Sequence, residues 1–191
     1  MSWYQMDASF QSMSDDDLKS LCERRLEERE FGWALKLADA LISRNSRHVS
    51  IAYFYKGKAF QALGDSPDSC RGLSLDAFDA ALAKAEGDVL DSKYCMLIET
   101  NIARNLYVLG RYEEADEIYA EWYRGLVGGW YDYNDMSLML YCLTLRRLGC
   151  YEKAERIASN HEEDAENKEM IRTLIEEMKN RTKPEDSVFL R

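Results

Sequence analysis

Two stretches of the chain are almost alike: LGRYEEA, from Leu109 to Ala115, and LGCYEKA, from Leu148 to Ala154. Glycine tolerates the left-handed backbone conformation that ends many helices. The aromatic residue two positions later can fill the wedge between two helices. The alanine three positions further on lets the two helices cross closely. The repeated pattern therefore predicts two helical hairpins, each with its turn at the glycine.

Weaker copies of this pattern lie earlier in the chain. LGD, from Leu63 to Asp65, begins as the strong copies do, and REFGWA, from Arg29 to Ala34, keeps the aromatic residue and the alanine without the glycine. The whole chain has only two prolines and ten glycines. Such a scarcity of helix breakers, beside abundant helix-forming residues, favours helices over strands. We expect an all-α protein.

The predicted organisation is a single helical-repeat domain over residues 14–181, between a lead-in at 1–13 and a tail at 182–191. Hydrophobic spacing and turn signals divide this domain into helix pairs and a final helix. The pairs are expected near residues 15–45, 49–86, 90–124 and 135–160, and a C-terminal capping helix near 163–181. The stretch 66–72 looks like an insertion of about five residues, judged against the ordinary length of such repeats.

The repeated turn resembles that of the tetratricopeptide family, whose unit is a pair of helices. Gly57 and Phe60 also match the first helix of that unit, and Tyr119 matches the aromatic position of the second. The chain departs from the family in its irregular spacing and in the missing proline between repeats. The resemblance implies a divergent tetratricopeptide-like solenoid of about four pairs.

Members of that family offer the surfaces of their first helices as a concave groove. Carried over by position, the resemblance implies a groove for an extended segment or helix of another protein. The predicted groove contacts are Phe54, Lys58, Asn101, Arg104, Tyr107, Met139 and Arg146. Lys58, Arg104 and Arg146 would form a positive line, although local pairing with acidic residues is an equally good alternative. Met136 and Met139 are either adaptable contacts or core.

An aromatic cluster, Trp130, Tyr131 and Tyr133, follows the Gly128-Gly129 link. Exposed tryptophan and tyrosine side chains are typical anchors of protein interfaces. The same rings could instead pack under the helix that follows. The sequence leaves both alternatives open.

Composition excludes several classes of function. The net charge is −10, which disfavours nucleic acid as a partner. Five cysteines without a secretory segment are typical of reduced thiols, and no stretch is apolar enough to span a membrane. We therefore expect a cytoplasmic protein without a membrane segment. No catalytic constellation, metal site or cofactor motif is recognisable, and the two histidines, His48 and His161, are far apart.

These observations predict a non-enzymatic scaffold, adaptor or chaperone-like subunit. The alternatives are a helical-repeat RNA-binding protein, which the acidic charge disfavours, and a toxin-neutralising or secretion-effector chaperone partner. The sequence does not predict the oligomeric state.

Overall fold

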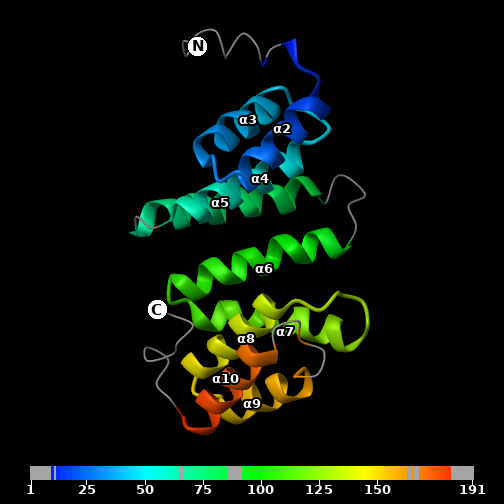
Figure 1. The fold of residues 1–191 in the computed structure, drawn as a ribbon. Coiled ribbons are helices and arrows are strands. Elements are labelled where there is room, and N and C mark those ends of the chain that lie inside the picture. The colour runs from blue at the N-terminus through cyan, green and yellow to red at the C-terminus, as the bar shows by residue number, and fades with distance from the viewer. Residues whose placement is uncertain are drawn as a thin grey trace. The chain divides into compact units, whose positions relative to one another are not determined.

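A computed structural model describes residues 10, 12–64, 67–85, 92–162, 165 and 168–181. Over these residues every element of regular secondary structure is a helix, and there is no strand (Figure 1). The predicted all-α class, with helices packed in successive pairs, is confirmed. The predicted tail at 182–191 and nearly all of the lead-in at 1–13 lie outside the described residues.

The helices fall into two compact units, Met1–Ile98 and Glu99–Arg191, with the boundary inside helix α6. The expectation of one domain over residues 14–181 stays a prediction, and each unit is described by itself. The first contains α2 (Asp15–Glu27), α3 (Phe31–Ser43), α4 (Val49–Leu63), α5 (Pro67–Ala85) and the start of α6 (Ser92–Val108). The second contains the rest of α6, α7 (Tyr112–Val127), α8 (Asp135–Arg147), α9 (Tyr151–Asn160) and α10 (Lys168–Lys179).

The repeated sequence pattern produces the same turn three times. Arg29, Gly110 and Gly149 all have left-handed backbones, with φ of 59°, 77° and 75°. In each turn the next residue donates its N–H to a carbonyl five residues earlier. These bonds are Glu30 N to Arg25 O at 2.8 Å, Arg111 N to Leu106 O at 2.9 Å and Cys150 N to Leu145 O at 2.8 Å. This is the hydrogen bond that closes a Schellman-type helix end, and Arg29 adopts it without the glycine.

Unit 1 is built on closely packed small residues. Its core includes Leu18, Cys22, Ala34, Leu37, Ala38, Leu41, Ala52, Tyr55 and Ala59. The Cys22 Sγ donates to the Ala34 carbonyl at 3.3 Å, which ties α2 to α3. On α4, a Cβ at Gly57 would lie 2.6 Å from the Phe78 ring, so only glycine allows α5 to pack this closely. The Ser74 hydroxyl donates to the Gly57 carbonyl at 2.8 Å and fixes the same crossing.

Residues 67–72 of the suspected insertion at 66–72 form part of a helix. Helix α5 begins at Pro67, whereas the hydrophobic pattern predicts a helix only from about Leu73. Proline suits the first position of a helix because its backbone has no N–H to satisfy and its φ is already helical. The extra residues therefore lengthen α5 at its N-terminus.

Unit 2 contains the same kind of hydrogen bond from a cysteine thiol to an alanine carbonyl as unit 1, and it also contains the terminal helix. The Cys142 Sγ donates to the Ala154 carbonyl at 3.6 Å, as Cys22 does to Ala34. Helix α10 packs against α8 and α9 and buries an apolar face that includes Leu174, Ile175 and Met178. The described part of the predicted capping helix thus covers the preceding pair.

The left-handed turn gives a direct test of the repeat geometry. A Cβ at Gly149 would meet no neighbouring atom, so Gly149→Ala should destabilise through its φ alone, by about 1–2 kcal/mol. Gly72 also has open space around it but lies inside α5, so the control Gly72→Ala should stabilise by about 0.5–1 kcal/mol. Urea unfolding of both variants measures the two effects. Equal shifts of the same sign would contradict the turn.

Candidate functional site

The two predicted groove residues of unit 1 lie on α4. The Phe54 ring is half-buried in an aromatic cluster with Tyr55, Phe78 and Tyr94, at centroid distances of 6.1, 5.8 and 5.7 Å. Lys58 is also half-buried and has a partner within the molecule. The structure therefore gives Phe54 a packing role within unit 1.

Most of the predicted groove residues in unit 2 are buried. Asn101 is 8%, Tyr107 6% and Met139 8% exposed. The Tyr107 ring packs against that of Tyr112 at 5.6 Å, and Arg104 is half-buried. Of the two methionines considered as groove contacts, Met139 belongs to the core and Met136 is 45% exposed.

The expectation that Arg146 contacts a partner is wrong. Its side chain is fully buried, and its Nη1 donates to Glu177 Oε2 at 2.7 Å, where the Glu177 side chain is only 10% exposed. Helix α10 packs over α8 and brings this carboxylate to the guanidinium. A buried charge needs a partner because its loss of hydration must be offset. The predicted positive line thus loses Arg146, and its acidic partner comes from α10, not from its own helix as local pairing would require.

The buried pair can be tested by a double-mutant cycle. Arg146→Met leaves Glu177 buried without this cation and should lower the free energy of unfolding by about 3–5 kcal/mol. Adding Glu177→Leu should recover most of the loss, because an apolar pair of similar volume needs no charge partner.

The control for this cycle is an exposed pair. Arg111 and Glu114 are joined at 2.5 Å with side chains 49% and 54% exposed, so Arg111→Met should change stability little. If Arg146→Met were as mild as Arg111→Met in urea unfolding, α10 would not be docked on α8 as described.

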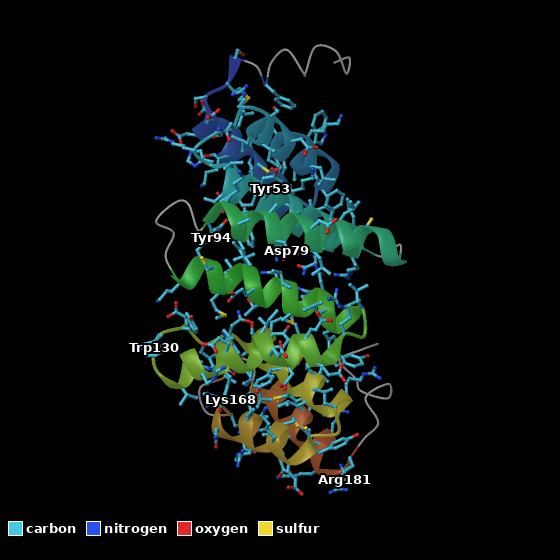
Figure 2. The ribbon with its side chains drawn as sticks, turned by 180° about the vertical axis from the view of Figure 1, so that it is seen from behind. Tyr53, Asp79, Tyr94, Trp130, Lys168 and Arg181 are labelled. Carbon is cyan, nitrogen blue, oxygen red and sulfur yellow. The ribbon has the colours of Figure 1, made fainter. Side chains whose placement is uncertain are left out.

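The end of α7, the α7–α8 connection and the start of α8 carry three exposed apolar side chains, which include the two most exposed large hydrophobic residues of the described part of the chain. Trp130 is 71% exposed, Val127 67% and Met136 45%. We call these three side chains the Trp130 surface. Figure 2 shows Trp130 at the margin of the ribbon, where this connection runs between α7 and α8. Large exposed apolar side chains gathered in one short segment typically mark an interaction site.

Backbone contacts fix the segment that carries Trp130. The Gly125 carbonyl at the end of α7 accepts the Trp130 N–H at 2.8 Å and the Tyr131 N–H at 3.3 Å. Gly129 supplies the left-handed residue of the turn, with φ of 73°, and donates to the Leu126 carbonyl at 3.0 Å. The chain thus leaves α7 through a closed turn.

Two tyrosine rings hold the same segment from either side. The Tyr131 ring lies against Gly125 so closely that a Cβ there would overlap it. The Tyr133 ring packs on His161 at 5.6 Å, and His161 in turn meets Tyr123 at 5.6 Å, edge to face. Of the two alternatives for this cluster, packing therefore applies to Tyr131 and Tyr133, and exposure applies to Trp130.

The segment that carries Trp130 is acidic in sequence. Between Gly125 and Leu145 the chain has Asp132 and Asp135 and no basic residue. The nearest cation in sequence, Arg124, is paired with Glu121 at 2.5 Å.

The described residues show little that would support chemistry. Burial raises the pKa of the Cys22 and Cys142 thiols to about 12, so both stay protonated near neutral pH and are poor nucleophiles. No group of three or more metal-ligating side chains gathers in the described part of the chain. None of its helices has the length and apolar character needed to cross a membrane.

Comparison with known proteins adds no name to this geometry. No protein-family model, curated protein or solved structure matches the chain. The tetratricopeptide resemblance consequently rests on the repeated turns and their sequence pattern, and membership of that family stays a prediction.

Signals for this surface were only partly present in the sequence. The Gly128-Gly129 link and the aromatic cluster could be located, but not which ring stays exposed. That choice depends on Gly125 and His161, which lie in neighbouring helix ends and receive Tyr131 and Tyr133. Val127 was not singled out, because the pair was expected to end near residue 124, whereas α7 continues to Val127.

Proposed function

We propose that this protein is a non-enzymatic interaction module of tetratricopeptide-like helix pairs that binds another protein through the Trp130 surface. The observation that carries the proposal is the 71% exposure of Trp130 on a segment fixed by Gly125, Tyr131 and Tyr133. The predicted groove is a weaker candidate, since Asn101, Tyr107, Met139 and Arg146 are buried.

The segment that carries Trp130 is ordered before it binds a partner, which lowers the entropy cost of binding. Immobilising a flexible side chain at an interface costs about 0.5–1.5 kcal/mol. The backbone that carries Trp130 is already fixed by its bonds to Gly125, so binding would order little more than the indole itself. A tryptophan that enters a desolvated pocket typically accounts for at least about 2 kcal/mol of binding energy on truncation. Val127 and Met136 would extend the contact, and methionine adapts readily to a partner's shape.

The helix pairs would serve as the scaffold. Three of the pairs are closed by the same left-handed turn, at Arg29, Gly110 and Gly149. The connection that bears Trp130 is held between two ordered helices, α7 and α8. This arrangement supports an adaptor or chaperone-like role, in which rigidity is supplied by the repeat and specificity by one surface.

The proposal predicts a selective loss of binding in Trp130→Ala. A partner would first be captured on the immobilised wild-type chain from a lysate of the source cells, identified by mass spectrometry and purified. Titration should then show at least about 30-fold weaker affinity for Trp130→Ala, the equivalent of about 2 kcal/mol. The variant should keep the wild-type unfolding midpoint, because the side chain is mostly in solvent.

The matched control is Val108→Ala, an exposed apolar side chain at the end of α6 that is 52% exposed. It should bind the partner as the wild type does. Equal affinity of Trp130→Ala and wild type for every captured partner would refute the assignment of this surface.

A further inference from the structure

A surface pocket lies in unit 1, at the turn between α2 and α3. It has a volume of about 420 Å³, and its apolar walls are formed by Phe31, Trp33 and Leu63. Arg29 and Lys36 also line it. Leu63 is 40% exposed although it ends helix α4. The volume lies in the lower part of the range of small-ligand pockets, so it suits a single large side chain.

The first described residues of the chain are fixed beside this pocket. The Phe10 ring meets the Trp33 ring edge to face, with the ring centroids 6.3 Å apart. The Arg44 side chain donates to the carbonyls of Phe10 and Met13, to the second at 2.9 Å, and pairs with Asp15 at 3.2 Å. Phe10 and Met13 also pack, partly buried, against the core of unit 1. Trp33 is therefore both a wall of the pocket and the contact of Phe10.

The sequence before Phe10 continues the apolar series to which Phe10 and Met13 belong. Trp3, Met6, Phe10 and Met13 follow one another at intervals of three, four and three residues. This spacing is typical of one apolar face of a helix. Residues 1–9 lie outside the described part of the chain, but Trp3 and Met6 repeat the spacing of the two packed residues. Tyr4 stands outside the series and offers a matched comparison.

We propose that the N-terminal segment, residues 1–9, is the ligand of this pocket and that the Trp3 side chain fills it. The segment and the pocket both belong to unit 1. Seven residues of chain from Phe10 to Trp3 span about 10 Å as a helix and at most about 25 Å when extended. Since the pocket begins at the ring that Phe10 already touches, either conformation reaches it. The indole and the apolar walls then leave water together, which drives the contact.

Occupation by Trp3 covers an apolar end of the first helix pair. A terminal pair in a helical repeat has no preceding neighbour, so its outer face needs a cover. Because the segment is joined to the chain at Phe10, its effective concentration at the pocket is high. A side chain of another protein would enter only by displacing Trp3. The proposed function does not depend on this contact, because Trp130 belongs to unit 2.

Fluorine NMR of the full chain labelled with 5-fluorotryptophan tests the proposal from the side of the segment. The substitutions Trp3→Phe and Trp33→Phe assign the two resonances that matter. Trp3→Ala empties the pocket, so the Trp33 resonance should shift. The control Tyr4→Ala removes an adjacent aromatic side chain outside the apolar series and should leave the Trp33 resonance in place.

The reciprocal arm changes the pocket and observes Trp3. Leu63→Asp places a carboxylate in the apolar wall and should release Trp3, whose line should sharpen and gain the full solvent isotope shift between H₂O and D₂O. The control Leu73→Asp alters another exposed apolar side chain of unit 1, 47% exposed, and should leave the Trp3 resonance unchanged. If Leu63→Asp lowers the unfolding midpoint, Leu63→Ala removes the same wall without adding charge and should move the Trp3 resonance in the same direction.

Three results would overturn the inference. The first is a Trp3 resonance that is already sharp and fully solvent-shifted in the wild type. The second is a Trp33 resonance that moves no more in Trp3→Ala than in Tyr4→Ala. The third is a Trp3 contact that is lost on dilution, which would assign the pocket to the segment of a second copy. The Trp130 resonance should stay in place in all of these variants, so failure here leaves the proposed function untouched.

Discussion

At two positions an aromatic ring lies so close to a glycine that a Cβ on that residue would overlap the ring. Each unit depends on one of these close contacts. In unit 1 the Phe78 ring lies against Gly57, which sets the crossing of α4 and α5. In unit 2 the Tyr131 ring lies against Gly125, which draws the chain back onto α7 just after Trp130. Tyr131 is packed there, whereas the adjacent Trp130 is 71% exposed.

The same interactions recur in different helix pairs, because each pair must pack two helices closely against each other. Cys22 and Cys142 each donate to the carbonyl of an alanine twelve residues later, Ala34 and Ala154. Both thiols are buried within their pairs, and the raised pKa of each follows from that burial. Small core residues and left-handed turns therefore account for the scaffold, while the parts that differ between pairs, such as the segment after α7, are available for function.

The sequence predicted what depends on local pattern. Helix pairs and their turns follow from spacing and glycine, and the structure has them close to the expected ranges. Arg29 shows where local reasoning weakens, since the turn keeps its left-handed residue without the glycine that signals it. Pro67 was interpreted as part of an insertion, although it is also a favourable helix start.

The remaining features depend on contacts between residues distant in sequence. Arg146 meets Glu177 from another helix, so its burial was not visible in the pattern of α8 alone. The only hint of this pairing in the sequence was Glu177, which stands next to Met178 and so beside the apolar face of the last helix. Trp130 and Tyr131 are adjacent aromatic residues of similar propensity, and only the position of Gly125 relative to the returning chain distinguishes them.

Fluorine NMR of the chain labelled with 5-fluorotryptophan tests most directly whether Trp130 is both exposed and held in place. The chain has four tryptophans, and loss of one resonance in Trp130→Phe assigns the signal. Measured at a concentration where the chain is monomeric, the Trp130 resonance should show a full solvent isotope shift between H₂O and D₂O, with a line nearly as broad as that of Trp122, which is 3% exposed. A sharp line would show a freely moving segment, and a missing isotope shift would show a buried ring; either result would contradict the account.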